Sequence, residues 1–297
     1  MMITEAAKNL SNEISEIIVL DPTENCPAAQ AGAKQIVGDF KDEDAIVKLA
    51  EQSDIITYEI ESGNTDVLSK VKAEIEPSPS TLGIIQDKLL QKTFLLENEL
   101  PISQFYKITS LDDLRKKINE LGLPVLLKSR RDAYDGRGNY KISSLEEIEK
   151  AYQYFDGKSL MVEKFVDFKM EVSVIAVRNT KGEIAVYPLV ENIHEDNILK
   201  MTVAPARVSD DVINDAGEIA KKTMDVLKGA GVFGIEMFID QNDRILINEI
   251  APRVHNSGHH TLQSCRTSQF EQHLRAILGL ELGSTDLVHK TVMCNIL

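Results

Sequence analysis

Two apolar stretches near the end of the chain constrain its fold more than any other part of the sequence. They read GVFGIEMFI (231–239) and RILINEI (244–250), and only the polar letters DQND separate them. A short polar turn between two strand-like stretches predicts an antiparallel hairpin. Each strand carries a single acidic side chain among apolar neighbours, Glu236 on the first and Glu249 on the second. We therefore expect a hairpin that presents one carboxylate from each strand.

The register of this hairpin decides whether the carboxylates meet. If Asp240 pairs with Ile245, the two glutamates lie directly opposite one another, and if Ile239 pairs with Arg244, they lie on a diagonal. Both registers put the carboxylates on one face, with Cβ atoms roughly 5–8 Å apart. A register slipped by one residue would turn them to opposite faces. The sequence predicts a carboxylate pair and leaves the register open.

A carboxylate pair at that spacing repels itself unless a cation lies between the two groups. Hard oxygen ligands suit Mg²⁺, with Mn²⁺ as an alternative. Asn248 faces the other side of an ideal strand, so it joins the site only if the strand end twists. A solvated pair of glutamates is the other interpretation, and it holds for most such pairs. The strongly apolar strands and the histidine-rich segment after them favour a metal site.

Composition excludes several classes of function. The chain has 297 residues, 43% of them hydrophobic, and a net charge of −14. This acidity opposes binding to nucleic acid or to an anionic membrane, and no apolar run approaches the roughly 20 residues of a membrane span. Anionic substrates would need a local island of Lys, Arg and backbone N–H groups. The three scattered cysteines show no metal-ligand spacing, which favours a reducing, cytoplasmic location.

The order of predicted elements indicates an α/β unit followed by an α+β unit. Helical patterns at 3–10 and 42–52 alternate with strand patterns at 16–22 and 54–61, which implies a parallel sheet. The chain starts inside a helix, with no strand before it. After the break at PSPS (77–80), a helical stretch and then mostly strands follow, interrupted by a long helix at about 209–229.

A basic, glycine-containing segment follows the predicted strand PVLLKSR. It reads RRDAYDGRGNY (130–140) and combines Gly136 and Gly138 with three arginines. Backbone N–H groups of such a mobile loop can cradle phosphates. The segment is not a Walker A motif, because G-K-[ST] is absent. A plain β-turn at Asp-Gly is the alternative.

Four charged residues in apolar surroundings are further candidates. Lys128 ends the strand PVLLK, where a charge is costly without a partner, and an anion such as phosphate would supply one. Lys88 and Lys92 lie one helical turn apart, which favours a solvated helix face. Glu163 in LMVEKFV could read an adenine together with nearby backbone groups, or could be an outward residue of a half-buried strand.

The segment APRVHNSGHHT (251–261) crowds His255, His259 and His260 around Gly258. The spacing is not that of a zinc helix, and no cysteine pair accompanies it. Neutral polar groups that bind a substrate fit this pattern better than metal ligands. A set of surface histidines is equally compatible with the sequence.

Several of these motifs together resemble a known family. IIQDKLLQK, VLLKSRRDAYDGRGNY, VEKFVDFKMEVSVIAVRN, GVFGIEMF, NEIAPRVHNSGHHT and SQFEQHLRAI are similar, in this order, to the 5-(carboxyamino)imidazole ribonucleotide synthases. These are ATP-grasp enzymes of de novo purine biosynthesis. The resemblance implies an ATP-grasp fold behind a Rossmann-like pre-ATP-grasp domain that lacks its first strand. Its expected domains are 1–80, 81–280 with a smaller lid subdomain at about 122–168, and 281–297 as the start of a C-terminal β domain.

The resemblance also implies roles for individual residues. Magnesium would be held by Glu236 and Glu249. The catalytic contacts would come from Tyr134, Asp135 and Arg137. The ATP site would include Lys88, Lys128, Ala133, Gly136, Gly138, Glu163, Lys164, Phe165, Val166, Glu171, His194, Asn248 and Glu249. The nucleotide substrate would be bordered by Arg130, Asn256, Ser257 and His259.

The implied reaction joins bicarbonate to an amine. Bicarbonate attacks the γ-phosphate of ATP, and the resulting carboxyphosphate, or CO₂ released from it, is captured by the amine of aminoimidazole ribonucleotide. Metal ions, Lys and Arg would neutralise the transferring phosphoryl group, and a covering loop would exclude water. The resemblance further implies a homodimer. A formate-dependent glycinamide ribonucleotide transformylase, another ATP-grasp ligase and a non-catalytic nucleotide-binding protein are the alternatives.

The sequence departs from the family pattern in three ways. Asp132 and Ala133 stand where the family usually has two glycines, which predicts a stiffer and more acidic loop. The family's opening strand with its GGGQLGRM-like loop has no counterpart, and neither has its C-terminal β domain. We therefore expect a chain shortened at both ends, with weak or no activity by itself.

Overall fold

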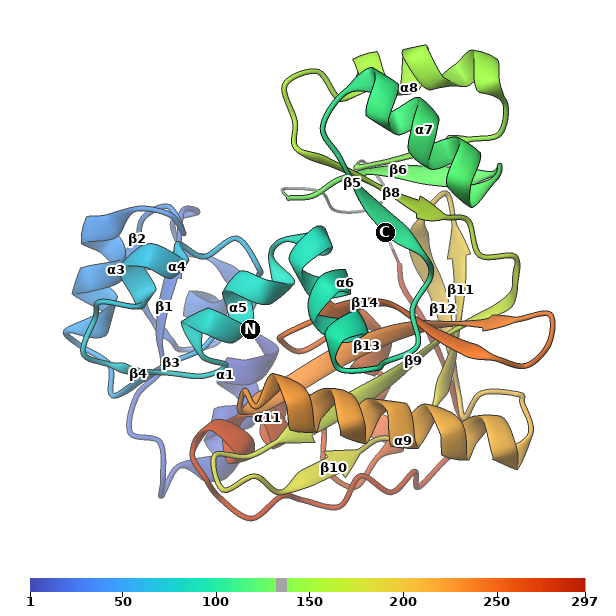
Figure 1. Cartoon of the computed structure of the whole chain (residues 1–297). Helices are drawn as coiled ribbons and strands as arrows, with labels where there is room; N and C mark the ends of the chain where they lie inside the picture. Colours follow the sequence, from blue (N-terminus) through green and yellow to red (C-terminus); the bar gives the residue numbers. More distant parts are fainter. Residues whose placement is uncertain (132–137, 297) are drawn as a thin grey trace.

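The computed structural model describes residues 1–131 and 138–296. Its N-terminal part, in blue in Figure 1, is a small α/β unit. In it, β1 (Ile18–Asp21) pairs in parallel with β2 (Lys34–Val37), and β3 (Ile55–Ile56) with β4 (Glu74–Ile75). The helices of this unit are α1 (Met2–Ala7), the 3₁₀ helix η1 (Lys8–Leu10), α2 (Pro27–Gln30), α3 (Glu43–Ala50) and α4 (Thr65–Leu68). The predicted βα alternation is confirmed.

The strand predicted at 54–61 is much shorter than expected. Only Ile55 and Ile56 pair with a neighbouring strand. The following residues turn toward the rest of the molecule, because Thr57 Oγ1 bonds His273 Nε2 at 2.7 Å and Glu61 forms an ion pair with Arg253 at 2.8 Å. Contacts with a distant part of the chain therefore end the strand early.

The helical stretch predicted over 81–98 is divided into α5 (Pro79–Ile85) and α6 (Lys88–Glu97). Asp87 causes the division, because its side chain accepts hydrogen bonds from the N–H groups of Leu89 and Leu90 and so starts a second helix. α6 lies at the centre of the molecule, between the N-terminal unit and the two parts of the chain described next, the small sheet and the large sheet (Figure 1). Gln91 on α6 exchanges two hydrogen bonds with the backbone of Ile250, which fixes the helix against the hairpin.

The unit drawn in green at the top of Figure 1 contains the small sheet. Its antiparallel strands run in the order β5 (Phe105–Ile108), β8 (Leu160–Lys164), β6 (Val125–Ser129) and β7 (Asn139–Ile142). One face packs against α7 (Leu111–Leu121) and α8 (Ile148–Tyr154), which follows the 3₁₀ helix η2 (Leu145–Glu147). Alternation along the strands turns Val125, Leu127 and Val162 toward these helices. The same alternation turns Lys128 and Glu163 to the opposite face.

The large sheet forms the rest of the molecule. Its order is β14 (Ile245–Ala251), β13 (Gly231–Asp240), β9 (Phe168–Arg178), β11 (Val190–Glu195), β12 (Ile198–Ala204) and β15 (Thr291–Cys294), and β10 (Ile184–Val186) also pairs with β9. Helix α9 (Asp210–Leu227) packs its buried face against β9 and β13. The other helices here are the 3₁₀ helix η3 (Asn256–Gly258), α10 (Thr261–Ser264) and α11 (Gln269–Ile277). The predicted long helix and hairpin are both confirmed.

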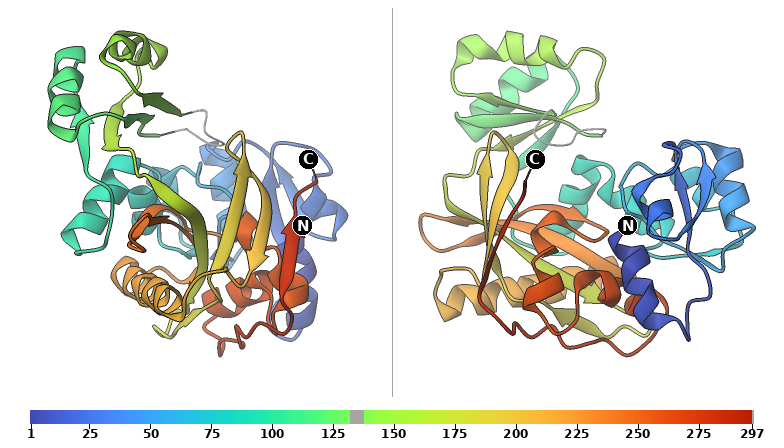
Figure 2. Two further views of the ribbon diagram at one scale, coloured as in Figure 1. Left: turned by 90° about the vertical axis from the view of Figure 1, so that its right-hand side faces the viewer. Right: turned by 180° about the vertical axis from the view of Figure 1, so that it is seen from behind.

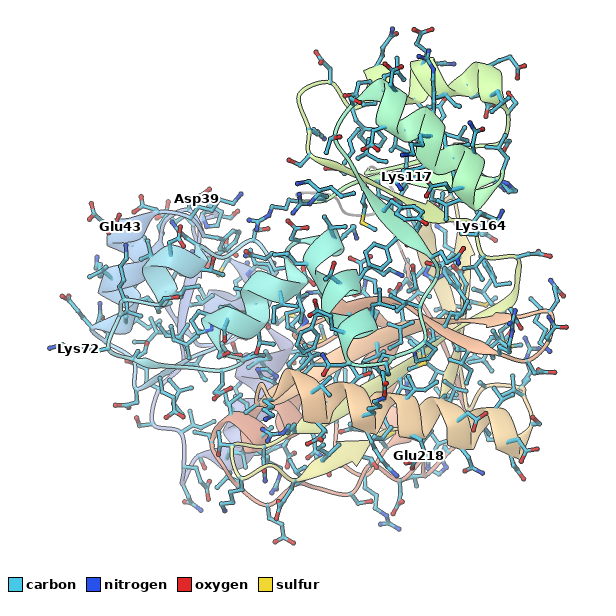
Figure 3. All side chains as sticks on the ribbon, viewed as in Figure 1. Asp39, Glu43, Lys72, Lys117, Lys164 and Glu218 are labelled. Carbon is cyan, nitrogen blue, oxygen red and sulfur yellow. The ribbon has the colours of Figure 1, made fainter. Side chains whose placement is uncertain are left out.

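The N-terminal unit is joined to the large sheet by a shared apolar cluster. Ile3 and Leu10 pack with Phe270, Leu274 and Ile277 of α11, and Figure 2 shows α1 beside these C-terminal helices from behind. Charged side chains such as Asp39, Lys72 and Glu218 project from the periphery (Figure 3). Within residues 1–131 and 138–296, no helix has the length and apolar character needed to cross a membrane.

Candidate active site

A β-bulge brings the glutamates of the hairpin together. Near the turn, Ile239 pairs with Ile245 and Met237 with Ile247, a register one residue away from both expected ones. Continued unchanged, that register would set Glu236 opposite Asn248. The bulge makes Asn248 an extra residue, and Glu236 lies directly opposite Glu249. The expected carboxylate pair is confirmed, and the bulge also explains how Asn248 reaches the same site.

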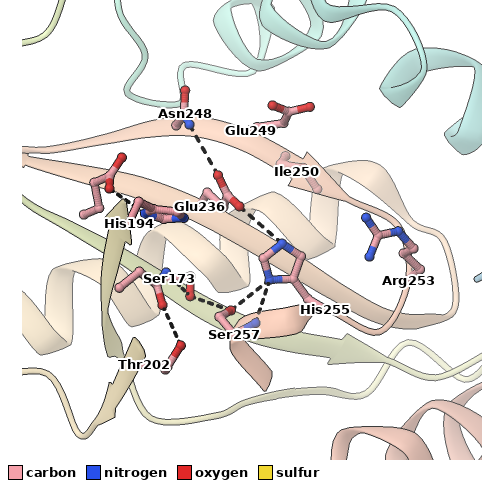
Figure 4. Close-up of polar contacts among 12 residues, drawn as sticks. Ser173, His194, Thr202, Glu236, Asn248, Glu249, Ile250, Arg253, His255 and Ser257 are labelled. Atoms are coloured by element: carbon pink, nitrogen blue, oxygen red, sulfur yellow. Dashed lines mark hydrogen bonds and ion pairs between the residues drawn. The ribbon is translucent and has the colours of Figure 1, made fainter. Parts of the chain in front are cut away.

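Glu236 is held at both oxygens. Its Oε2 accepts a hydrogen bond from Asn248 Nδ2 at 3.4 Å, and its Oε1 lies 3.3 Å from His255 Nε2 (Figure 4). Burial alone would raise the pKa of Glu236, but the hydrogen bond from His255 and the charges of His255, His194 and Lys88 bring this pKa down to about 2. Glu236 is therefore a carboxylate at neutral pH, as a hard-metal ligand must be.

Lys88 supplies a cation to the second glutamate. It is the first residue of α6, and its Nζ lies 2.5 Å from Glu249 Oε1. Burial alone would lower the pKa of Lys88, but its ion pair with Glu249 and the nearby Glu163 and Glu236 raise it. The predicted solvated face for Lys88 and Lys92 is wrong, because the Lys88 side chain is 16% exposed and Lys92 is buried.

Lys128 finds its anionic partner within the protein. Its Nζ forms an ion pair with Glu163 of the neighbouring strand β8, and Lys92 Nζ lies 3.3 Å from the other oxygen of Glu163. Burial alone would raise the pKa of Glu163, but the two lysines lower it to about 2. All three side chains are buried, so one carboxylate is shared by two ammonium groups. Glu163 is thus not an outward strand residue.

These charged groups line a pocket between α6, the small sheet and the hairpin. Its walls are Lys88, Gln91, Lys92, Lys128, Met161, Glu163, Asn248 and Glu249. A second pocket adjoins the first at Asn248 and is lined by Glu171, Val172, Asn192, His194, Glu236, Met237, Phe238 and Asn248. In the second pocket, Glu171 bonds His194 Nδ1 at 2.6 Å, and this bond outweighs burial and raises the pKa of His194. The two polar hollows therefore share Asn248 as part of their walls.

Comparison with known proteins decides the family. The ATP-grasp domain model matches residues 93–270, and the model of the ribonucleotide synthetase preATP-grasp domain matches residues 1–86. The N5-carboxyaminoimidazole ribonucleotide synthase of Bacillus subtilis is 39% identical across 100% of this chain, which covers 78% of that protein. The chain belongs to the N5-carboxyaminoimidazole ribonucleotide synthase family of ATP-grasp enzymes.

Solved structures of this family have the same fold. An ADP complex of an N5-carboxyaminoimidazole ribonucleotide synthetase superposes with a TM-score of 0.94 at 38% identity, over 100% of this chain and 78% of the other. The Aspergillus clavatus synthase with ADP and 5-aminoimidazole ribonucleotide gives a TM-score of 0.93 at 38% identity, over 99% and 78%. Phosphoribosylaminoimidazole carboxylase of Candida albicans is 41% identical across the whole chain, which spans 54% of that longer protein. The ATP-grasp and pre-ATP-grasp domains expected from the sequence are confirmed.

Arg130 is held by a residue that sequence reasoning did not select. Asp87 accepts hydrogen bonds from Arg130 Nε at 3.0 Å and Nη2 at 2.6 Å, and from Arg131 Nε at 3.2 Å. Asp87 therefore ties the end of β6 to the start of α6, and it has little capacity left for other partners. The glycine-containing segment continues into residues 132–137, so the predicted Ala133, Tyr134, Asp135, Gly136 and Arg137 lie outside the described residues. Gly138 is described, and its carbonyl accepts from Ser129 N.

The segment proposed to hold adenine ends β8. Lys164 Nζ donates to the carbonyls of Gly122 and Leu123, and the Phe165 ring lies under Lys141 Nζ at 3.8 Å from its centroid. Lys164 therefore contacts the loop before β6, and Phe165 contacts strand β7 of the small sheet. Any contact with a base from this segment, including Val166, would come from its backbone or its apolar surface.

The histidine-rich segment is more buried than a surface cluster. The side chain of His255 is 12% exposed and His260 is buried, so the interpretation as surface histidines is wrong for both. Ser257 is also fully buried, with its hydroxyl bonded to Ser173 and His255. This burial removes Ser257 as a direct border of a substrate pocket. Asn256 and His259 flank it in and after η3, half-buried or exposed.

The donor set at the hairpin fits a divalent cation. In the part of the chain that the structure describes, no three His, Cys, Asp or Glu side chains group around a common metal position. A metal here would therefore have two carboxylates from the protein, and phosphate oxygens and water would complete its shell. That is the pattern by which Mg²⁺ binds at nucleotide sites, where it keeps waters and uses only one or two carboxylates.

Proposed function

We propose that this chain catalyses the ATP-dependent carboxylation of 5-aminoimidazole ribonucleotide with bicarbonate. The products would be N5-carboxyaminoimidazole ribonucleotide, ADP and phosphate, a step of purine biosynthesis. Family membership supports this proposal, and the observation that carries it is the pair Glu236–Glu249 beside Lys88 and Lys128. The chain spans about half the length of the fungal carboxylases that it matches, so the activity is proposed for the residues present here.

The lysines and glutamates suit phosphoryl transfer. Mg²⁺ held by Glu236 and Glu249 would neutralise charge on the phosphates of ATP. Lys88 and Lys128 reach the same pocket from α6 and β6, where their ammonium groups can bind phosphate oxygens. Glu163 holds Lys128 in place through an ion pair inside the protein. These residues would orient the γ-phosphate for in-line attack.

Bicarbonate needs activation because it is a poor electrophile. One of its oxygens attacks the γ-phosphorus, and the bond to the β–γ bridging oxygen breaks to release ADP. The amine nitrogen of the nucleotide then attacks the carboxyl carbon of carboxyphosphate, phosphate leaves, and the nitrogen loses a proton. We propose contacts with the nucleotide from Asn256, His259, Tyr134, Asp135 and Arg137, with the last three outside the described residues. For Arg130 we propose an anchoring role through Asp87.

We also propose a division of the chain that differs slightly from the sequence expectation. Residues 1–80 would form the pre-ATP-grasp unit, 81–280 the ATP-grasp unit, and 281–297 the start of a C-terminal β domain. The small subdomain would begin near residue 105 rather than 122, because β5 belongs to the small sheet. A homodimer is part of the proposal on family resemblance. A cytoplasmic location is supported by the free state of Cys26, Cys265 and Cys294.

A coupled assay of ADP release tests the reaction. Purified chain with Mg-ATP is expected to release ADP when bicarbonate and 5-aminoimidazole ribonucleotide are both added, at a low rate in keeping with the weak activity expected from the sequence. ¹³C-bicarbonate should label the carbamate of the product. Formate with glycinamide ribonucleotide serves as the competing pair. ADP release with formate and glycinamide ribonucleotide, and none with bicarbonate, would assign the chain to the formate-dependent ligases. Binding of Mg-ATP without turnover of either pair of substrates would indicate a non-catalytic nucleotide-binding protein.

A further inference from the structure

A chain of buried hydrogen bonds crosses the large sheet and ends at Glu236. It starts on β12 and passes through β11 and β9 to the histidine-rich segment (Figure 4). Its members are Thr202, Asn192, Ser173, Ser257 and His255. Apart from His255, all of them are buried. Buried polar side chains must each find a hydrogen-bond partner, and these five satisfy one another in series.

The first three hydrogen bonds of this series have a defined direction, and they determine the fourth. Thr202 Oγ1 donates to Asn192 Oδ1 at 3.2 Å, and Asn192 Nδ2 donates to Ser173 Oγ at 2.9 Å. Ser173 Oγ then donates to Ser257 Oγ at 2.7 Å. Since each hydroxyl has one hydrogen, Ser257 is left with its own to give to the remaining neighbour, His255 Nδ1 at 2.8 Å.

A backbone N–H independently identifies Nδ1 of His255 as a hydrogen-bond acceptor. The N–H of Ser257 also points at His255 Nδ1, at 3.3 Å. A backbone amide can only donate, so Nδ1 must be the nitrogen without a proton. The proton of the neutral ring therefore lies on Nε2, which faces Glu236 Oε1 at 3.3 Å. The donors and acceptors in this series of hydrogen bonds are thus all consistent with one arrangement, in which His255 Nε2–H donates to Glu236.

Packing leaves the imidazole of His255 in one position. Its ring lies against the backbone of β13 at Gly234, where an added Cβ would come within 2.5 Å of the ring. Its own backbone is bound on both sides by one amide, since Gln269 Oε1 accepts from His255 N at 3.0 Å and Gln269 Nε2 donates to His255 O at 2.7 Å. The ring can neither flip nor withdraw without breaking several contacts.

We propose that His255 is a positioning residue that holds the Glu236 carboxylate for metal binding, with its Nε2–H tautomer set by the buried hydroxyl chain. This inference rests on the proposed function of the hairpin as a metal site. Asn248 binds the other oxygen of Glu236, so the two donors together fix the plane of the carboxylate. In this arrangement Nδ1 of His255 accepts hydrogen bonds within the core and Nε2 donates to Glu236, so both ring nitrogens have partners.

The first test measures the Mg²⁺ affinity of a series of variants at position 255. Mg²⁺ is titrated calorimetrically into protein saturated with a non-hydrolysable ATP analogue. His255→Leu is expected to weaken Mg²⁺ binding about 10- to 100-fold, the usual effect of losing a group that orients a metal ligand. His255→Gln, whose amide reaches the position of Nε2, should recover most of this loss. His289→Leu, at an exposed histidine, is the matched control and should bind as wild type does.

Steady-state kinetics separate positioning from general damage. The Leu variant should need more Mg²⁺ for half-saturation, while kcat at saturating Mg²⁺ stays within a few-fold of wild type. Equal Mg²⁺ affinity in the Leu variant and wild type would overturn the proposal. So would failure of the Gln variant to recover any affinity while its unfolding transition matches that of wild type.

The second test reads the tautomer and needs no metal or activity. In ¹⁵N-detected NMR of the whole chain, His255 should show a protonated Nε2 and an unprotonated Nδ1. Ser173→Ala removes the hydroxyl that donates to Ser257, and it should add only a minor population with the opposite tautomer, because the Ser257 N–H still points at Nδ1. A protonated Nδ1 in wild type would refute the inference even if Mg-ATP binds. If Mg-ATP fails to bind and the tautomer is as expected, the proposed function is wrong and the hydrogen-bond chain stands.

Discussion

At the residue scale, the site depends on carboxylates whose charges are balanced by nearby cations. Glu163 is the clearest case, because it is 3% exposed and contacts Lys128 and Lys92 together. Removing one member of such a buried cluster leaves a charge without a partner, which costs more than the cluster contributes. Glu163 should therefore control the pH dependence of stability.

Glu163→Gln should remove a stabilising contribution that is itself lost in acid. The folded-state pKa of about 2 lies below the ordinary value of 4.5, so the contribution is complete above pH 4.5 and disappears as the pH falls toward 2. Its size is on the order of 3 kcal/mol at neutral pH. Urea unfolding from pH 7 to pH 3 should show wild type approaching the variant as the pH falls. Glu218→Gln, at an exposed glutamate, should keep the wild-type profile, and a constant gap for Glu163→Gln would contradict the assignment.

The opposed glutamates make a second prediction at this scale. Glu236→Gln and Glu249→Gln should each weaken Mg²⁺-dependent ATP binding at least 10-fold, since an amide is a poorer ligand than a carboxylate for a hard cation. Calorimetric titration of Mg-ATP measures the change, again with Glu218→Gln as the control. Unchanged binding in both variants would show that the metal does not bind at the hairpin.

At the element scale, the hairpin β13–β14 shows what a single extra residue does. Two strands with a strict period of two would have fixed the faces of all their side chains once the turn was set. The register set at the turn would pair Glu236 with Asn248 and turn Glu249 to the opposite face. The bulge at Asn248 shifts this register by one residue, so that Glu236 pairs with Glu249 on one face. Sequence patterns predict the strands well but do not reveal the bulge, because Asn248 continues the strand in every local respect.

Gly234→Ala tests how closely β13 and His255 must approach. The new Cβ would lie within 2.5 Å of the His255 ring and 2.6 Å of its Cβ, so the ring has to move away from Glu236. We expect weaker Mg²⁺ binding, comparable to that of His255→Leu, and a loss of stability of about 1–3 kcal/mol from overpacking. Gly217→Ala, in α9 with open space around it, is the matched control and should be neutral or slightly stabilising. Normal Mg²⁺ affinity in Gly234→Ala would show that the contact is dispensable.

At the scale of the whole molecule, the pocket is a junction of separate units. Lys128 and Glu163 belong to the small sheet and Glu249 to the large sheet, and α6 contributes one lysine to each. A ligand that contacts all of them should hold the units together and stabilise the folded chain. The N-terminal unit is attached mainly through α1 and α11, away from this pocket.

Mg-ATP at 100 times its Kd should therefore stabilise the chain by about 2.7 kcal/mol, as linkage requires for a ligand that binds only the folded state. Thermal unfolding with and without ligand measures this shift. Lys128→Met, from the small sheet, and Glu249→Gln, from the large sheet, should each reduce the shift. A variant from one sheet that keeps the full shift would show that the ligand contacts only the other sheet.

The element types, the carboxylate on each strand of the hairpin and the family could be predicted from local sequence patterns, because these depend on residues close together in the chain. Which charges meet depends on how distant segments pack. Lys92 looked like a solvated residue because its partner Glu163 lies far away in sequence, and the hydrogen bonds that end at His255 come from strands that no local pattern connects. Burial and pairing of polar groups are properties of packing between distant segments, and only the folded chain brings those segments into contact.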